Sequence, residues 1–106
     1  MKKENFNIMT NIKIIEDLKA QLICVIGEFF KLLNKGSNVA QEAISDSISG
    51  AIIILYILAA KLGYSFSEID HVIKAKLEMG IRAEDLIEQD DRSLSRLKKY
   101  INSRID

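Results

Sequence analysis

Three acidic residues are the best candidates for chemistry in this chain. Glu28 lies in the otherwise apolar segment 25–33, and Glu42 and Asp46 are four residues apart, so they share one face of a predicted helix. The short connection at 34–38 makes the two helices antiparallel neighbours, so Glu28 could face the other two carboxylates across a groove. Converging carboxylates repel unless a cation joins them, and oxygen-rich clusters suit Mg²⁺. The spacing equally fits solvated surface carboxylates, so both interpretations stay open.

Basic residues further along the chain could complement a phosphate-bearing ligand. Lys74, Lys76 and Arg82 follow the second long helix, and lysine and arginine side chains are well suited to phosphate. Lys76 lies seven residues after Ile69, near the predicted buried stripe, so its aliphatic stem is expected to pack inside. Taken alone, each of these residues is typical of a solvated surface charge.

The other reactive residue types give weaker signals. Cys24, the single cysteine, lies in an apolar run and is expected to be a buried, inert thiol, because a thiolate needs an electropositive, partly open site. His71, the single histidine, is expected to be a surface or structural residue. The sequence has no glycine-rich phosphate loop, Cys/His metal spacing or serine elbow.

The composition indicates one small globular domain. The chain has 106 residues, of which 48% are hydrophobic and 28% charged, and it contains no proline. Fifteen Lys and Arg residues balance fifteen Asp and Glu residues, which makes nucleic acid an unlikely partner. One cysteine excludes an internal disulfide, and residues 1–5 lack the pattern of a signal peptide, so we expect a cytoplasmic protein.

Apolar periodicity predicts an all-α fold of two long and two shorter helices. Residues 1–9 are expected to be a flexible lead-in to a single domain that spans 10–106. The first helix should end at Asn34, since Gly36 can take the left-handed conformation that closes a helix. The second, capped by Ser37 or Asn38, should run to about Leu62.

The two shorter helices occupy the rest of the chain. A capping box over 65–68 or 67–70 should start the third helix, and Gly80 should end or weaken it. Residues 81–91 are acidic and irregular, with at most one short turn, and the last helix should begin at about residue 90.

The second half of the second helix, from Ala51 to Ala60, is apolar around its whole circumference. A helix without a polar face must be covered on all sides, which three other helices of so short a chain would not do. Asp46 and Lys61 enclose an apolar run shorter than the ~20 residues of a membrane span. We therefore expect a homo-oligomer, a dimer or tetramer, and no membrane.

The order of these elements resembles the MazG-like branch of the all-α nucleoside triphosphate pyrophosphatases, the group that includes MazG and the dimeric dUTPases. The resemblance covers roughly residues 10 to 104 and implies a MazG-like helical bundle completed by homo-oligomerisation. Its ligand would be a nucleotide or a nucleotide-like small molecule. The segments that carry the resemblance are 26–33, 40–46, 52–64, the Lys-to-Arg stretch 76–82, and 93–97.

In active members of that group, a Glu-x-x-Glu pair and a Glu-x-x-Asp pair on consecutive helices hold Mg²⁺ for cleavage between the α- and β-phosphates. The first pair corresponds here to Val25 and Glu28, so one acid is missing. Alignment through residues 62–63 puts Ser47 and Gly50 at the second pair. Either alignment leaves the four-carboxylate set incomplete.

Alignment on the acids instead uses Glu42 and Asp46, with one residue too many between them. The resemblance then implies a Mg²⁺-dependent pyrophosphohydrolase with Glu28, Glu42 and Asp46 as metal-binding and catalytic residues. The alternative is a catalytically inactive oligomer that binds or sequesters a nucleotide. The candidate nucleotide-binding residues in both cases are Lys74, Lys76 and Arg82.

Overall fold

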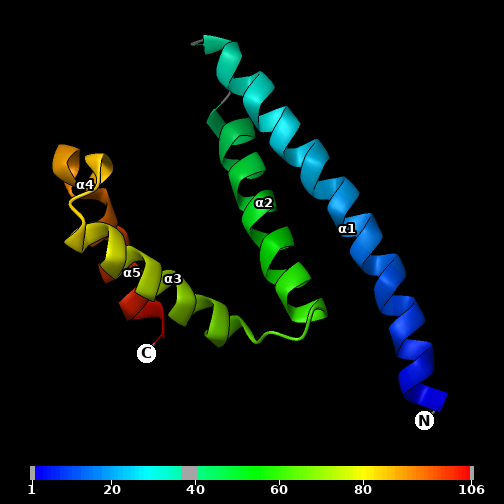
Figure 1. Cartoon of the computed structure of the whole chain (residues 1–106). Coiled ribbons are helices and arrows are strands. Elements are labelled where there is room, and N and C mark those ends of the chain that lie inside the picture. Colours follow the sequence, from blue (N-terminus) through cyan, green and yellow to red (C-terminus); the bar gives the residue numbers. More distant parts are fainter. Residues whose placement is uncertain (1, 37–40, 106) are drawn as a thin grey trace. The chain divides into compact units, whose positions relative to one another are not determined.

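The computed structural model describes residues 2–36 and 41–105, with residues 2–8 and 105 described for their backbone only. The described residues form five α-helices and no strand, which confirms the predicted all-α class (Figure 1). They divide into two compact units, Met1–Gly63 and Tyr64–Asp106. The single domain over 10–106 stays a prediction, and the units are described separately.

The first unit is a hairpin of two helices, α1 (Lys2–Asn34) and α2 (Gln41–Lys61), which run antiparallel (Figure 1). Helix α1 begins at Lys2 and not at about residue 10 as predicted, because residues 2–9 contain no proline or glycine to break the helix; the flexibility of residues 1–9 stays a prediction. The predicted ends are confirmed, since Gly36 has φ +65° and Gly63 has φ +103°. The predicted cap at 37–38 lies outside the described residues.

An inner seam of half-buried and buried side chains joins α1 to α2. Its members recur at steps of three and four residues, the spacing that keeps side chains on one face of a helix. One contact fixes how the helices are aligned, because a Cβ at Gly50 would lie 3.9 Å from a γ-carbon of Val25. The inner seam consists of Leu18, Leu22, Val25, Phe29 and Leu32 of α1 and Ser47, Gly50, Ile54 and Leu58 of α2.

The second unit contains α3 (Phe66–Arg82), α4 (Leu86–Asp91) and α5 (Ser93–Ile105). Helices α3 and α5 pack side by side and antiparallel (Figure 1). Two ion pairs follow this alignment, Asp70–Arg104 at 3.2 Å and Glu78–Lys98 at 3.9 Å. The buried hydrophobic residue of each helix, Leu77 in α3 and Ile101 in α5, supplies the core between them.

The predicted capping box at the start of α3 is confirmed for Ser65 and Glu68. The Glu68 N–H donates to the Ser65 hydroxyl at 3.0 Å, and the Ser65 N–H donates to the Glu68 carboxylate at 2.9 Å. Both bonds hold the pKa of Glu68 below its ordinary value, and the bond from the Ser65 backbone N–H has the larger effect. Two local residues therefore fix where α3 begins.

The prediction that Gly80 ends α3 is wrong, because the helix continues to Arg82. A Cβ at position 80 would lie only 2.8 Å from Leu94 Cδ1 and 3.0 Å from Asp85 Oδ2. Glycine at this position therefore allows the start of α5 to approach α3 closely. The region 81–91, expected to be irregular apart from one turn, contains the additional short helix α4.

Helix α4 supplies the cap for α5. The Glu88 carboxylate is buried and accepts two bonds from Ser95, one from its N–H at 3.0 Å and one from its hydroxyl. Asp91 likewise accepts a bond from the Ser93 N–H at 3.1 Å. The first turn of a helix has N–H groups without helical partners, and these two carboxylates satisfy two of them.

Glu88 should make the stability of the protein depend on pH. The bond from the Ser95 hydroxyl lowers the pKa of Glu88 more than burial raises it. The folded state thus gains stability that is present above the ordinary glutamate pKa of about 4.3 and is lost as the pH falls through the lowered value. We expect Glu88→Gln to lower the melting temperature at pH 7, and the difference from wild type to shrink as the pH falls below about 4.3.

Thermal denaturation followed by circular dichroism between pH 7 and pH 3 tests this expectation. Asp90→Asn, which neutralises an exposed carboxylate on the same short helix, is the matched control and should keep the wild-type profile. Glu68 is present in all three proteins, so its own titration cancels. If the difference in melting temperature between Glu88→Gln and wild type stayed constant over this pH range, the stabilising role assigned to the Glu88 charge would be wrong.

Candidate functional site

The structure places the three candidate carboxylates on one side of the α1–α2 hairpin. Glu28 directly precedes Phe29 of the inner seam, and Asp46 directly precedes Ser47 of the same seam. One residue turns a helix by about 100°, and the helices are antiparallel, so a step backward turns both toward the same side. Glu42 lies one turn before Asp46, and all three side chains are exposed. We call this surface the Glu28 side.

A shallow pocket on the Glu28 side includes two of these carboxylates. It has a volume of about 490 Å³ and is lined by Gln41, Glu42, Ser45, Asp46 and Ser49 of α2. The pocket is open to solvent and lined by α2 alone, so it offers a surface on which a small molecule could rest and does not enclose one. Its lining offers amide and hydroxyl groups beside the two carboxylates, a set that can form hydrogen bonds with a polar ligand.

Three further positions lie near the level of Glu28, where α1 packs against the first half of α2. Val25 lies against Gly50. Because the helices are antiparallel, three residues forward along α1 and three residues back along α2 bring Glu28 level with Ser47. Val25 and Gly50 are half-buried, and Ser47 is buried. Packing therefore occupies this part of the hairpin, and Glu28 is its only acidic member.

Comparison with known proteins decides the family. The MazG-like family matches residues 8–94, which is most of the chain. This chain belongs to the MazG-like family. The predicted resemblance is confirmed. Searches of the curated proteins and of the solved structures found no match.

In this MazG-like chain, Val25 and Glu28 correspond to the first acidic pair of active relatives, and alignment through residues 62–63 assigns Ser47 and Gly50 to the second pair. The contact between Val25 and Gly50 supports that alignment, because positions that bind one ion must lie together. Valine and glycine side chains offer no oxygen ligand, and the serine is buried in the seam. A complete metal cradle therefore does not fit at these positions.

The shifted set of Glu28, Glu42 and Asp46 is only partly assembled in this MazG-like chain. The three residues share one side of the hairpin, but no three His, Cys, Asp or Glu side chains are grouped closely enough to hold a metal among the residues that the structure describes. Metal binding by the shifted set stays a prediction.

The basic residues of the MazG-like chain do not form one patch on α3. Lys74 and Arg82 lie eight residues apart along one face of α3, with Glu78 between them and 3.5 Å from Arg82. Lys76 is two residues from Lys74, about 200° around the helix. The expectation that its stem packs inside is wrong, because Lys76 is exposed and Leu77 fills the buried position. Their role in nucleotide binding stays a prediction.

Two other sequence-based expectations have clear outcomes. Cys24 is exposed, not buried, because it precedes Val25 and so lies on the Glu28 side of α1. His71 is exposed on α3, as expected for a surface residue.

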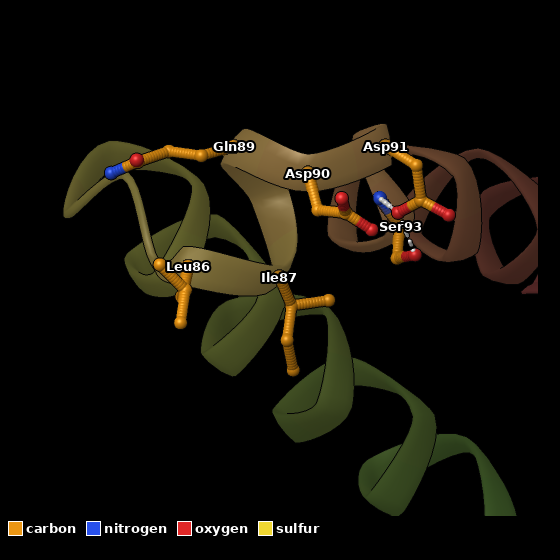
Figure 2. Close-up of a pocket in the computed structure, with 6 residues that line it drawn as sticks. All are labelled: Leu86, Ile87, Gln89, Asp90, Asp91 and Ser93. Atoms are coloured by element: carbon orange, nitrogen blue, oxygen red, sulfur yellow. Dashed lines mark hydrogen bonds between the residues drawn. The ribbon is translucent and has the colours of Figure 1, made fainter.

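A second pocket, in the other unit, involves none of the predicted site residues. It has a volume of about 530 Å³, and Figure 2 shows its six lining residues, with Leu86 and Ile87 apart from Asp91 and Ser93. Asp91 is already used, since it accepts the N–H and hydroxyl of Ser93 (Figure 2). Asp91 in this pocket therefore has a structural role, as a cap of α5. No pattern in the sequence indicates this pocket.

Proposed function

We propose that this MazG-like protein binds a nucleotide or a nucleotide-like small molecule on the Glu28 side of its α1–α2 hairpin. The observation that supports binding without cleavage is the packing of Val25 against Gly50, at positions where active relatives carry acids. A hydrolytic metal site needs ligands that neutralise the developing phosphate charge, and the substituted positions supply none. The open pocket lined by Glu42 and Asp46 offers carboxylate acceptors for the hydroxyl and amino groups of a nucleoside, whereas its negative charge repels phosphate groups unless a cation accompanies them.

A second candidate function is pyrophosphohydrolysis of a nucleoside triphosphate. It is supported by the presence of Glu28, Glu42 and Asp46 on one side of the hairpin, where they could serve as a shifted set of ligands for Mg²⁺. Lys74, Lys76 and Arg82 of the second unit are kept as candidate phosphate-binding residues on the strength of their side-chain chemistry alone. Both functions place the protein among nucleotide-handling proteins.

One experiment separates the two functions. Purified protein is incubated with a panel of ribo- and deoxyribonucleoside triphosphates, with and without Mg²⁺, while pyrophosphate release and the melting temperature are measured. We expect at least one nucleotide to raise the melting temperature by several degrees without releasing pyrophosphate, because a ligand at 100 times its Kd stabilises the folded state by about 2.7 kcal/mol.

Matched variants assign the effect to the site. Asp46→Asn should reduce the nucleotide-dependent shift, whereas Glu16→Gln, an exposed carboxylate on the opposite side of α1, should leave it unchanged. If pyrophosphate is released and Glu28→Ala abolishes the release by at least about 100-fold, the hydrolytic function is correct instead. If no nucleotide gave a melting-temperature shift and none was turned over, both proposed functions would be overturned.

A further inference from the structure

Two lysines at the end of α1 lie on the same side of the hairpin as the candidate carboxylates. Lys31 directly precedes Leu32, a buried member of the inner seam, just as Glu28 directly precedes Phe29. Lys35 is seven residues after Glu28, which is close to two full turns of a helix. Its N–H donates to the Leu32 carbonyl at 3.2 Å, so the chain still follows the last turn of α1 at this point. Both lysines therefore belong to the Glu28 side.

The contact between Val25 and Gly50 gives the level of Lys31 along α2. Lys31 is six residues after Val25, and in an antiparallel pair this brings it level with the residue six positions before Gly50. That level lies midway between Glu42 and Asp46. The axes of packed helices are about 8–10 Å apart, so the lysine and the two carboxylates flank one strip of surface.

The two lysines are not paired with the acids of this surface. Among the residues that the structure describes, no ion pair joins Lys31 or Lys35 to a carboxylate, although Glu28 lies only one turn before Lys31. In contrast, Lys19 earlier in α1 lies 2.9 Å from Glu16. Both terminal lysines are exposed. Each ammonium group has three N–H donors, which can bind the oxygens of a phosphate group.

The helix dipoles do not exclude an anion from this end of the hairpin. The last turn of a helix carries a partial negative charge and the first turn a partial positive charge. Counted from the contact between Val25 and Gly50, Gln41 at the start of α2 is level with Asn34 at the end of α1. The opposite partial charges therefore offset each other, and the charged side chains determine the local potential.

The balance of these charges limits the length of the phosphate chain. Glu28, Glu42 and Asp46 contribute three negative charges and the two lysines two positive ones, which leaves one negative charge on this surface. Each phosphate group beyond those in contact with the lysines adds negative charge that no further cation of this surface balances. The surface therefore favours a nucleotide with a short phosphate chain over a triphosphate.

We propose that Lys31 and Lys35 bind the phosphate end of a nucleoside mono- or diphosphate without a metal ion, while Glu42 and Asp46 accept hydrogen bonds from its nucleoside end. This inference rests on the proposed function, because it assigns the two ends of the ligand to two parts of the Glu28 side. It explains how a surface with an acidic pocket accommodates a phosphorylated ligand. All of these contacts come from the first unit, so the site requires no residue of α3.

Titration calorimetry in the presence of EDTA tests the assignment of the phosphate end. The ligands are adenosine, AMP, ADP and ATP, and the corresponding guanosine, cytidine, uridine and thymidine series. For the preferred base, the mono- or diphosphate should bind wild type at least about tenfold more tightly than the nucleoside, because it adds charge-assisted hydrogen bonds. It should also bind more tightly than the triphosphate.

Lysine variants locate the phosphate contact. The double variant Lys31→Gln with Lys35→Gln should weaken binding of the preferred nucleotide at least about tenfold and leave the Kd of the nucleoside within about twofold. Lys19→Gln is the matched control, because Lys19 follows the inner-seam residue Leu18 and so lies on the opposite side of α1. It should leave both dissociation constants unchanged.

Two further measurements complete the test. Asp46→Asn should weaken the nucleoside and the nucleotide by the same factor, because the carboxylate contacts only the part that both ligands share. In wild type, raising the salt concentration from about 50 to about 500 mM should weaken the nucleotide and spare the nucleoside, since salt screens exposed charges. The salt measurement needs no variant, so it holds even if a substitution prevents folding.

The failure of this inference is distinguishable from failure of the proposed function. If nucleotides bind but the double lysine variant keeps the wild-type Kd, or if binding requires Mg²⁺, the assignment of the lysines is overturned and the proposed function stands. A triphosphate that binds most tightly in EDTA would overturn the assigned length of the phosphate chain. If neither nucleosides nor nucleotides bind wild type, the inference and the proposed function are both overturned.

Discussion

Replacing Ile101 with alanine is expected to lower the free energy of unfolding by about 2–5 kcal/mol, the range for truncating a large buried aliphatic side chain. Ile101 is 3% exposed, and it and Leu77 are the buried hydrophobic residues of α5 and α3, two helices that pack against each other. The core of this small unit has few other buried apolar residues among those described, so little neighbouring material can collapse into the cavity. The loss is a large part of the about 5–15 kcal/mol that stabilises a typical domain.

Urea denaturation followed by far-ultraviolet circular dichroism measures the effect. Leu97→Ala is the matched control, because Leu97 lies on the same helix but is 45% exposed and should cost about 1 kcal/mol or less. The variant's slope against urea concentration should match that of wild type if only stability changes. Equal losses for Ile101→Ala and Leu97→Ala would contradict the assignment of Ile101 to the core.

Helix boundaries could be predicted where a local signal fixes them. Gly36 and Gly63 follow their helices in left-handed conformations, and Ser65 and Glu68 bond to each other across three residues. Each of these devices involves neighbours in sequence, so the sequence is sufficient to find it. The start of α1 had no such signal, because residues 2–9 contain acceptable helix formers and no required cap.

The burial of α1 could not be predicted because its sequence carries two apolar rows. Leu22 and Ile23, Val25 and Ile26, and Phe29 and Phe30 are adjacent apolar pairs. Periodicity shows that both rows exist but not which one faces α2, since that depends on the partner helix. Cys24 was expected to be buried for this reason, although it lies outside both rows.

The candidate site was predictable in part. Counting from the turn predicts that Glu28 could face Glu42 and Asp46 across a groove. Helix period and the antiparallel hairpin put Glu28 and Asp46 on one side, but a site formed by them stays a prediction. The distances between the carboxylates depend on how the helices pack, which the sequence does not specify. Glu88 was missed for a similar reason, since its partner Ser95 lies seven residues later, beyond the left-handed Arg92.

Two glycine-to-alanine substitutions are expected to change stability in opposite directions. Gly63 has φ +103°, a conformation that L-residues rarely adopt, so Gly63→Ala should lower the free energy of unfolding by about 1–2 kcal/mol. Gly27 lies inside α1, and a Cβ added there would have no atom within 4 Å. Gly27→Ala should therefore raise the free energy of unfolding by about 0.5–1 kcal/mol, because alanine has a higher helix propensity and restricts the unfolded chain.

The pair separates backbone conformation from side-chain packing. The same methyl group is added at two sites with no atom within 4 Å, so contacts made in the folded chain cannot explain a difference in sign. Thermal denaturation of both variants and wild type should therefore place Gly27→Ala above wild type and Gly63→Ala below it. A stabilising Gly63→Ala would mean that α2 ends without the left-handed residue, so that the chain could continue as helix toward Ser65 and displace the capping box of α3.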